Sequence, residues 1–469
     1  MADRDLEAAI AATRFGLGAR PGEIAAARSD PRGFLKAQIR REGADQPQPR
    51  ADATQARIIA YRDLGRQRRQ AKQAGDAEAA DPVQQVQKLL RQETGGDFAA
   101  RARLAALTEA GFRERWTLFW ANHFTVSAAK AATAPLVGPF EEEAIRPNIF
   151  GRFADLLGAA ETHPAMLLYL DQASSIGPGS RAAQYLGGRR RGVGAQKPNR
   201  PRGLNENLAR EILELHTVGV EGGYSQADVT EFARALTGLS VGGERDGDQL
   251  GEAVFREMAH EPGPRTVMGV RYAAGGRDQV AAILSDLAAR PQTARFVCGK
   301  IARHFVSDTP PPTLTERLER TWMASGGDLA AVAATLVDSP EAWDATPAKF
   351  KTPYEFLISS WRAAGGAPRD VTVLAPVLNG LGQKPFGAPS PKGWPEDAAV
   401  WAAPDAVVKR MAWAQAFAAR ATADRDPGDL AAQALGGRLR PQTATAIARA
   451  ESRAEGFALL LMSPEFQRR

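Results

Sequence analysis

The sequence predicts a mainly α-helical protein, a compact array of many helices with at most a few short strands near residues 240–275. Alanine dominates the composition, leucine and arginine are common, and β-branched and aromatic residues are sparse, which favours helices. Segments before and after residues 240–275 show helical patterns. Within 240–275 the pattern is less regular, and the sequence His260-Glu261-Pro262-Gly263-Pro264 indicates a turn.

Length and composition predict a large core. A chain of 469 residues exceeds a typical domain of roughly 100 to 200 residues. We therefore expect three regions, residues 1–110, 111–240 and 241–469, integrated into one domain. A hydrophobic content of 44% supports a large core, and a charged content of 24% is ordinary for a soluble protein.

Helices and loops are expected in a definite order. Helices are expected at residues 8–14, 22–41, 58–103, 104–124, 141–157 and 164–171, and again from residue 279 onward. The helices of 58–103 should be long and mostly exposed, because this stretch is rich in Gln, Arg and Ala. Residues 176–202 are rich in Gly, Arg and Pro and have no hydrophobic period, which predicts a long flexible loop.

The helix at 104–124 has the clearest pattern. Trp116, Phe119, Trp120 and His123 are spaced i, i+3, i+4 and i+7, so they share one face of a helix. The aromatic rings of that face are expected to pack in the core. Asn122 and His123 lie where this helix should end, which makes them candidates for a polar site.

Residues 161–164 read Glu-Thr-His-Pro. Proline suits the first turn of a helix, and the residue before it is pushed out of helical geometry. His163 is therefore expected at the start of the helix that runs from Pro164 to Asp171. The positive end of the helix dipole would favour the neutral imidazole, which binds metals or accepts protons.

The segment 203–239 concentrates polar residues that hydrogen-bond at fixed geometry. They are Asn205, Glu206, Asn207, Arg210, Glu211, Glu214 and His216. On a regular α-helix Asn207, Glu211 and Glu214 share one face, and the i, i+3 carboxylates could share an ion. His216 would project almost opposite Glu211 and Glu214 unless the helix ends before it, an ending that Gly219 would permit.

The first hypothesis is an enzyme or ligand-binding protein with a polar crevice. The crevice would be lined by Asn122, His123, His163, Asp171, Asn205, Glu206, Glu211 and Glu214, with His216 on its margin and Asn207 in the same polar set. His163 would be a base or metal ligand, and Glu211 and Glu214 would be carboxylate ligands or acid–base groups. Arg210 would orient an anion or a carboxylate. A divalent metal would draw on His123, His163, Asp171, Glu211, Glu214 and His216, a set that suits Zn, Mn or Fe.

The second hypothesis is a non-enzymatic scaffold in which the same residues hold helices in register. Glu206, Arg210 and Glu214 form an i, i+4 ladder of alternating charge, and Asn205 suits the N-cap. His304 is expected to be a packed or capping residue. Convergence of His163 with the Glu211 and Glu214 carboxylates around a cavity would favour the enzyme, and separate pairing in a solid interior would favour the scaffold.

Other features disfavour several classes of protein. The net charge of +6 is small for this length, and the basic runs 66–72 and 189–191 are expected to be solvated, so nucleic-acid binding is not expected. Cys298 is the single cysteine, which leaves no intrachain disulfide and no CxxC zinc site. No GxxxxGK[ST], GxSxG or HExxH motif occurs. No secretory signal is visible, and no apolar run approaches the roughly 20 residues of a membrane span, which predicts a soluble cytoplasmic protein.

Five motifs together resemble the bacterial family called domain of unknown function 1800. They are RERWTLFWANHFTVS at 113–127, THPAMLLYLD at 162–171, NENLAREILELHTVGVEGGYSQADVTEFARALTG at 205–238, HEPGPRTVMG at 260–269 and KGWP at 392–395. The resemblance runs over nearly the whole chain, and the motif at 205–238 is highly specific.

The resemblance implies a large, mainly helical bacterial protein without an established activity. Members of the family are often exported and often encoded beside a sulfatase-like companion, so the resemblance implies a partner of that kind and leaves export open. This chain departs from the family in having no export signal and a longer loop at 178–202. It also has Leu239 where an aromatic residue, usually Trp, often follows the Thr-Gly pair.

Overall fold

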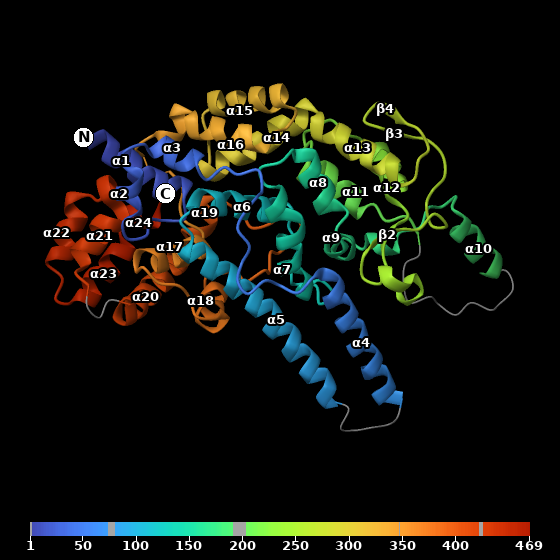
Figure 1. Cartoon of the computed structure of the whole chain (residues 1–469), viewed down its shortest axis with the longest axis horizontal. Helices are drawn as coiled ribbons and strands as arrows, with labels where there is room; N and C mark the ends of the chain where they lie inside the picture. Colours follow the sequence, from blue (N-terminus) through green and yellow to red (C-terminus); the bar gives the residue numbers. More distant parts are fainter. Residues whose placement is uncertain (1, 74–79, 191–202, 347, 422–424) are drawn as a thin grey trace.

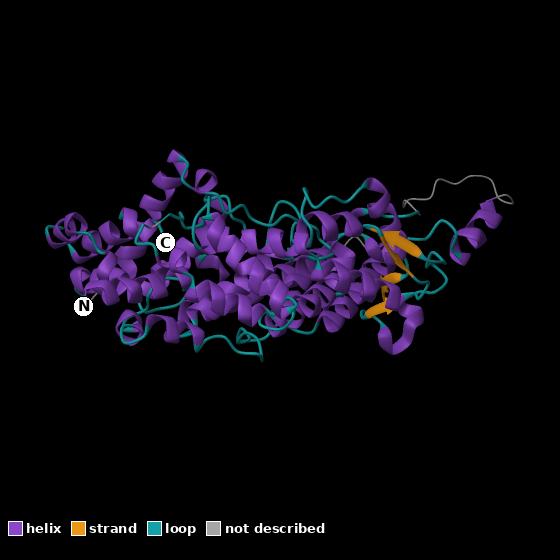
Figure 2. Cartoon of the chain, turned by 90° about the horizontal axis from the view of Figure 1, so that it is seen from above, coloured by secondary structure: helices purple, strands orange, loops and turns teal. Residues whose placement is uncertain are grey.

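The computed structural model describes residues 2–73, 80–190, 203–346, 348–421 and 425–469. Helices make up most of an elongated body, and the strands gather toward one end of it (Figure 2). In the described residues the strands form two antiparallel pairs, β1 (Leu239–Val241) with β2 (Ala253–Phe255) and β3 (Arg265–Val267) with β4 (Val270–Tyr272). The predicted fold class is therefore confirmed, including the position of the short strands.

The N-terminal part combines short helices with one long pair. The short helices are α1 (Ala2–Ile10), the π-helix η1 (Ala11–Phe15), α2 (Glu23–Ala27) and α3 (Pro31–Lys36). The long helices α4 (Thr54–Gln73) and α5 (Ala80–Leu107) extend away from the body (Figure 1). The inner end of α5 packs against the segment that leads into α7, and Phe98 and Arg101 of α5 line the cavity described below.

The central helices carry most of the predicted polar residues. They are α6 (Gly111–His123), α7 (Val137–Phe140), the π-helix η4 (Glu141–Ile145), α8 (Phe153–Glu161), α9 (Pro164–Tyr169), α11 (Asn207–Glu211), the π-helix η7 (Ile212–His216) and α12 (Gln226–Leu236). Trp116, Phe119 and Trp120 of α6 are buried, so the predicted aromatic face is a core face. The ring of Trp116 lies within 6.2 Å of Phe150 and 5.9 Å of Trp120, measured between ring centroids.

The C-terminal part is also helical. It contains α13 (Arg277–Ala289), α14 (Pro291–Phe305), α15 (Pro312–Ser325), α16 (Leu329–Asp338), α17 (Pro353–Ala363), α18 (Ala375–Gly380), α19 (Ala398–Trp401), α20 (Pro404–Ala421), α21 (Pro427–Leu435), α22 (Pro441–Ala448), α23 (Arg453–Met462) and α24 (Pro464–Gln467). Many of these helices begin with proline, whose missing N–H group costs no hydrogen bond at the first helical position.

Short 3₁₀ turns connect the helices. They are η3 (Ala134–Leu136), η5 (Arg146–Asn148), η6 (Gln172–Ser174), η8 (Glu244–Gln249), η9 (Pro340–Trp343), η10 (Val371–Val373) and η11 (Gly436–Arg438). The predicted loop 176–202 differs from the structure, because it contains α10 (Arg181–Arg190). The Ser180 hydroxyl accepts a hydrogen bond from the Ala183 amide and caps this helix, while the rest of the predicted loop, 191–202, lies outside the described residues.

Segments far apart in the sequence share one interior. Arg362 of α17 lies 2.7 Å from the Glu23 carboxylate of α2, and Arg438 donates a 2.6 Å hydrogen bond to the Thr13 hydroxyl of η1. Arg146 makes two 2.8 Å hydrogen bonds to Glu114 of α6, with both side chains buried.

The division into residues 1–110, 111–240 and 241–469 stays a prediction. Within the described helices, none combines the length and the apolar character needed to cross a membrane.

Candidate functional site

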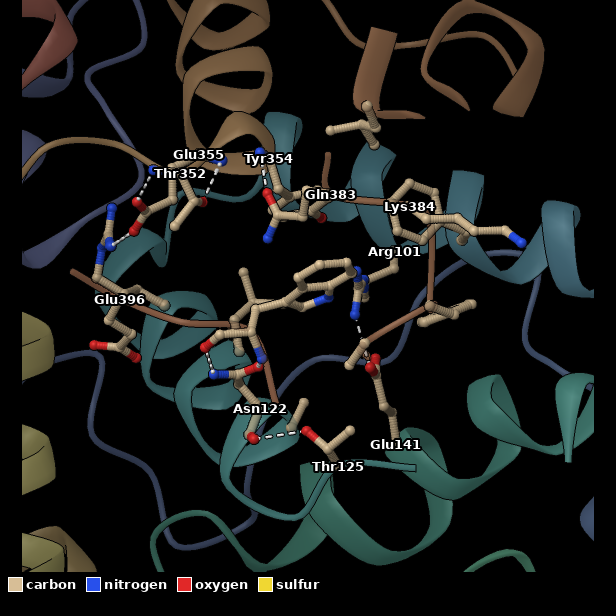
Figure 3. A pocket seen from close by; sticks show the side chains of 18 of the residues that line it. Arg101, Asn122, Thr125, Glu141, Thr352, Tyr354, Glu355, Gln383, Lys384 and Glu396 are labelled. Atoms are coloured by element: carbon tan, nitrogen blue, oxygen red, sulfur yellow. Dashed lines mark hydrogen bonds and ion pairs between the residues drawn. The ribbon is translucent and has the colours of Figure 1, made fainter. Parts of the chain in front are cut away.

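A cavity of about 120 Å³ lies where α5, α6 and α17 meet the loop that contains residues 383–396 (Figure 3). Leu118, Ala121, Val126 and Leu378 belong to its apolar wall. Tyr354 and Gln383 lie on one side of the cavity and Asn122 on the other. One buried water needs roughly 10–15 Å³ by the same kind of measure, so the cavity has room for a small ligand.

Asn122 fastens the loop that closes the cavity. Its amide nitrogen donates a 3.0 Å hydrogen bond to the Trp394 carbonyl oxygen, and the Trp394 backbone N–H donates a 2.7 Å hydrogen bond to its amide oxygen. Gly393 has a φ of 84°, and a side chain at this position would collide with the Asn122 carbonyl oxygen. Asn122, one of the predicted polar residues, therefore lines this cavity and positions the Gly393-Trp394-Pro395 turn.

His304 of α14 lines the cavity as half of a histidine–carboxylate pair. Its Nδ1 lies 2.7 Å from Glu396 Oε1, and its buried Nε2 has no hydrogen-bond partner in the described part of the chain. Burial lowers the pKa of His304, with Glu396 opposing the shift. Burial alone would raise the pKa of Glu396, but His304 and the positive charges of Lys349 and Arg469 lower it to about 2. An ionised Glu396 accepts the proton of Nδ1, which leaves the lone pair of Nε2 free to accept a proton.

Tyr354 of α17 supplies a proton donor to the same cavity. Its hydroxyl group is buried and makes no hydrogen bond to any described residue. Burial, reinforced by the negative charges of Glu114 and Glu141 and opposed by Arg101, raises the pKa of Tyr354 to about 12. The phenol therefore stays protonated near neutral pH.

Ion pairs fix both ends of the cavity. Arg101 lies 2.7 Å from Glu141 on one side, and Glu355 lies on the opposite side, with Glu396 near it (Figure 3). Glu355 accepts hydrogen bonds from Arg115 and from the Thr352 backbone N–H, and Arg469 Nε lies 2.9 Å from its carboxylate. Burial would raise the pKa of Glu355, but Arg469 and Arg115 hold it well below its ordinary value.

The structure places His163 where the sequence predicts, at the N-cap of α9, but with a partner that the sequence did not indicate. Its Nδ1 accepts a 3.1 Å hydrogen bond from the Ala165 backbone N–H. Its Nε2 lies 2.9 Å from Glu143 Oε2 of η4 and 3.4 Å from the Thr54 hydroxyl. Burial would raise the pKa of Glu143, but the hydrogen bonds from His163 and Thr54 hold it below its ordinary value.

His216 belongs to the π-helix η7, so the regular α-helix assumed in the prediction of its direction is not present. A π-turn has i→i+5 hydrogen bonds and changes the direction in which the residues after Glu211 project. His216 Nδ1 lies 2.7 Å from Glu161 Oε1, and both side chains are fully buried. The two atoms are not aligned for a hydrogen bond, and neither side chain hydrogen-bonds any described residue.

His123 lies beside this pair. Its Nε2 lies 3.1 Å from the His216 carbonyl oxygen, and its Nδ1 lies 2.9 Å from Lys300 Nζ. The ring centroids of His123 and His216 are 5.8 Å apart. Burial, together with the charges of Lys300 and His216, lowers the pKa of His123 well below its ordinary value. Two predicted histidines therefore meet, in the interior and without a described cavity around them.

The other predicted residues have separate partners. Lys130 lies 2.7 Å from Asp171, and the Tyr224 hydroxyl donates a 3.2 Å hydrogen bond to Glu214. Arg210 donates to Glu206, and Asn205 bonds the Leu170 carbonyl oxygen and the Asn207 backbone N–H. Burial raises the pKa of Glu211, with His216 opposing and Glu214 adding to the shift. Across the described residues, no three His, Cys, Asp or Glu side chains are arranged to hold a metal ion.

The family comparison covers all of these residues except Arg469. A family model described as Protein of unknown function (DUF1800) matches residues 10–468. The chain belongs to this family. No curated protein and no solved structure gave a significant match. The DUF1800 region thus includes the polar segment 205–216 and the cavity lining apart from Arg469.

Sequence reasoning missed three residues of the cavity in this DUF1800 protein. His304 was expected to be a packed residue, and Glu396 and Tyr354 were not candidates. His304 and Glu396 are 92 positions apart, and no local pattern links them. The available signal was weak: Glu396 directly follows the Lys392–Pro395 motif, and Tyr354 follows a proline that begins a helix.

Proposed function

We propose that the cavity is a proton-transfer site and that the protein is an acid–base enzyme acting on a small carbonyl compound. The supporting observation is that one cavity is lined both by His304, whose lowered pKa keeps it unprotonated, and by Tyr354, whose raised pKa keeps it protonated. Environments that push the pKa values of two groups apart assign one as base and the other as acid. The proposed site differs from the one predicted from the sequence, because His163, Glu211 and Glu214 do not line this cavity and Glu396 is the carboxylate paired with His304.

The proposed chemistry uses two buried atoms that have no hydrogen-bond partner among the described residues, His304 Nε2 and the Tyr354 hydroxyl oxygen. His304 Nε2 would accept the proton from a carbon next to the carbonyl group, and Glu396 would stabilise the imidazolium through Nδ1. The Tyr354 hydroxyl would donate a hydrogen bond to the carbonyl oxygen as it gains negative charge. Asn122 would hold the Trp394 loop against the cavity, which limits access of water.

Deuterium exchange tests this proposal directly. Small ketones and aldehydes would be incubated with the protein in D₂O, and loss of the C–H signal next to the carbonyl group would be followed by proton NMR. Wild type should accelerate exchange in at least one compound, and His304→Gln should remove the acceleration. His260→Gln is the matched control, because His260 is also buried and bonds the Thr237 carbonyl oxygen outside the cavity. Equal exchange in wild type and His304→Gln for every compound would contradict the proposal.

A bound Zn, Mn or Fe ion, one of the possibilities that the sequence leaves open, would find protein ligands in pairs among the described residues. The pairs are His163 with Glu143, His216 with Glu161 and His304 with Glu396. Catalytic zinc sites use three protein ligands. The proposed acid–base chemistry therefore uses the side chains alone, and elemental analysis of purified wild type and His216→Ala tests for a metal independently.

The scaffold hypothesis is the second candidate, with a sulfatase-like protein as its partner. It is favoured by the pairing of the residues of segment 205–216 with each other and with their neighbours, away from the cavity. In that case the double variant Glu206→Gln/Arg210→Gln should weaken co-purification with the companion protein, while Ala121→Trp, which fills the cavity, should not. Loss of co-purification in neither variant would count against a scaffold role for this segment.

A further inference from the structure

Gln383 presents a hydrogen-bond donor to the cavity that the protein itself does not use. Its side-chain oxygen accepts a 2.7 Å hydrogen bond from the Tyr354 backbone N–H, and within an amide group only the oxygen can accept such a bond. This contact fixes the amide and directs Nε2 into the cavity (Figure 3). Gln383 is 9% exposed, and its Nε2 makes no hydrogen bond to any described residue. A buried donor of this kind favours a ligand that carries an acceptor.

Other polar side chains of the wall already bond the protein. Both ends of the Asn122 amide bond the Trp394 backbone, and the Thr125 hydroxyl donates a 2.7 Å hydrogen bond to the Asn122 carbonyl oxygen. Polar atoms of the wall without a described partner include His304 Nε2, the Tyr354 hydroxyl and Gln383 Nε2. The Tyr354 hydroxyl lies at the opposite end of its side chain from the backbone N–H that holds Gln383. The two donors can therefore serve two different oxygen atoms of one ligand.

Arg101 is covered by groups of the protein. It lies 2.7 Å from Glu141. Its guanidinium carbon lies 4.8, 5.0 and 4.6 Å from the ring centroids of Phe98, Tyr354 and Phe386. The carboxylate and the three rings occupy the space around the guanidinium group, so Arg101 is not free to bind an anionic ligand.

The charges at the other end of the cavity are also paired. Arg115 and Arg469 both lie against Glu355, and Glu396 lies against His304. Apart from Lys384, the ionised residues of the wall are three arginines and three glutamates, so their charges cancel.

Lys384 adds no charge to the interior. It lines the cavity, but it is exposed, and its side chain extends away from the centre of the cavity (Figure 3). A ligand with a net charge would lose its hydration in the cavity without gaining an unpaired counter-charge, which costs several kcal/mol. An uncharged ligand avoids that cost.

We propose that the cavity binds a small uncharged hydroxycarbonyl compound and that Gln383 donates a hydrogen bond to its hydroxyl oxygen. The inference rests on the proposed function, in which Tyr354 bonds the carbonyl oxygen, and it names the substrate class of that site. A ketone without a second oxygen would leave the Gln383 donor buried and unpaired. A keto acid would bring an unpaired negative charge into a neutral wall.

Three ligands of nearly equal size separate these features. Hydroxyacetone carries a carbonyl and a hydroxyl group, butanone has a methyl group in place of the hydroxyl, and pyruvate has a carboxylate there. Their Kd values for the full chain would be measured by ligand-observed NMR titration near neutral pH at constant ionic strength. Hydroxyacetone should bind about 2- to 10-fold more tightly than butanone, the range of one neutral hydrogen bond. Pyruvate should bind at least about tenfold more weakly than hydroxyacetone.

Gln383→Met removes the donor and keeps the length of the side chain. The ratio of the butanone Kd to the hydroxyacetone Kd should fall to about one in this variant. Gln172→Met is the matched control, because Gln172 is fully buried and donates to the Leu236 carbonyl oxygen away from the cavity. It should keep the wild-type ratio. Ala121→Trp fills the cavity and should remove binding of hydroxyacetone and butanone, and circular dichroism of each variant checks its fold.

The wild-type measurements alone can overturn the inference, so it does not depend on the folding of a variant. Equal binding of hydroxyacetone and butanone, binding of pyruvate as tight as that of hydroxyacetone, or absence of binding for all three would each contradict it. Binding that Ala121→Trp leaves unchanged would place the ligand outside the cavity and would also contradict it.

The proposed function fails separately from this inference. Preferred binding of hydroxyacetone without accelerated deuterium exchange in any carbonyl compound would contradict the acid–base enzyme and retain the ligand class. Accelerated exchange that depends on His304, together with equal binding of hydroxyacetone and butanone, would retain the enzyme and contradict the role of Gln383.

Discussion

Two histidine–glutamate pairs in this DUF1800 protein have the same contact distance and different surroundings. His304 Nδ1 and His216 Nδ1 each lie 2.7 Å from a glutamate oxygen. The His304–Glu396 pair lines a cavity and its Nε2 faces no described partner. The His216–Glu161 pair has side-chain exposures of 0% and 1% and does not line that cavity. The two pairs therefore share their composition and contact distance, and they differ in that His304 and Glu396 line a cavity.

The surroundings also decide what each pair contributes to stability. Taking charges out of water costs several kcal/mol per ion, and only good partners offset that cost. Glu396 has Lys349 and Arg469 in addition to His304. The Glu161 carboxylate lies against His216 and accepts no hydrogen bond from any described residue. Removal of the histidine should therefore lower the free energy of unfolding more for the interior pair, His216–Glu161, than for the cavity pair, His304–Glu396.

The largest expected effect is on the stability of His216→Ala. The substitution leaves the Glu161 carboxylate buried without its partner and should lower the free energy of unfolding by about 3–5 kcal/mol. Urea denaturation followed by circular dichroism measures this loss. His304→Ala should cost less than about 2 kcal/mol, because other cations remain near Glu396. Equal losses in the two variants would remove the distinction between the pairs.

The next largest effect is on catalysis by the cavity pair. His304→Gln should lower the exchange rate at least about 100-fold, the usual contribution of a positioned base. His163→Gln removes a histidine of similar burial, paired with Glu143, and should leave exchange within about twofold of wild type, because general-base effects require contact with the reacting proton. Both effects are measured as proton NMR exchange rates in D₂O at a saturating concentration of the carbonyl compound. Loss of exchange in His163→Gln would move the reactive site to the residue that the sequence favoured.

Tyr354→Phe should change activity and stability in opposite directions. The hydroxyl is buried without a hydrogen bond to any described residue, so its removal should raise the free energy of unfolding by up to about 1 kcal/mol. Exchange should slow about tenfold or more, because the carbonyl oxygen loses its donor. Thermal unfolding and exchange, measured on the same preparation, test the pair of effects. A destabilised variant would indicate that the hydroxyl has a structural partner.

Local geometry was predictable from the sequence, and contacts between distant segments were not. Pro164 fixed the position of His163 at a helix start, and the Ser-x-x-Asp spacing of Ser225 and Asp228 corresponds to a capping box at the start of α12. The aromatic spacing of α6 predicted its buried face. The π-helix η7 could not be foreseen, since the apolar spacing of segment 205–216 fits a regular α-helix and the extra residue in the turn depends on tertiary packing. The pairing of His304 with Glu396 likewise depends on how α14 meets the loop after Gly393.

Acid pH should lower the free energy of unfolding through both members of the cavity pair, His304 and Glu396. The folded-state pKa of His304 is lowered from 6.5, and that of Glu396 is lowered from 4.5 to about 2. In both cases the unfolded chain binds the proton first, so the stabilisation is present above the unfolded pKa and is lost as pH falls. The loss attributable to His304 should begin below about pH 6.5, and that attributable to Glu396 should extend from about pH 4.5 toward 2.

Two variants distinguish the pH range in which His304 titrates from the range in which Glu396 titrates. Glu396→Gln should flatten the dependence of the unfolding free energy on pH between about 4.5 and 2, and His304→Gln should flatten it just below about 6.5. Urea midpoints measured in steps of one pH unit give both slopes. Glu143→Gln is the matched control: the pKa of Glu143 is also lowered, but its side chain is 34% exposed, so its removal should change the slope less. Equal flattening by Glu143→Gln and Glu396→Gln would contradict the expectation that the more buried carboxylate of the cavity pair contributes more to the pH dependence.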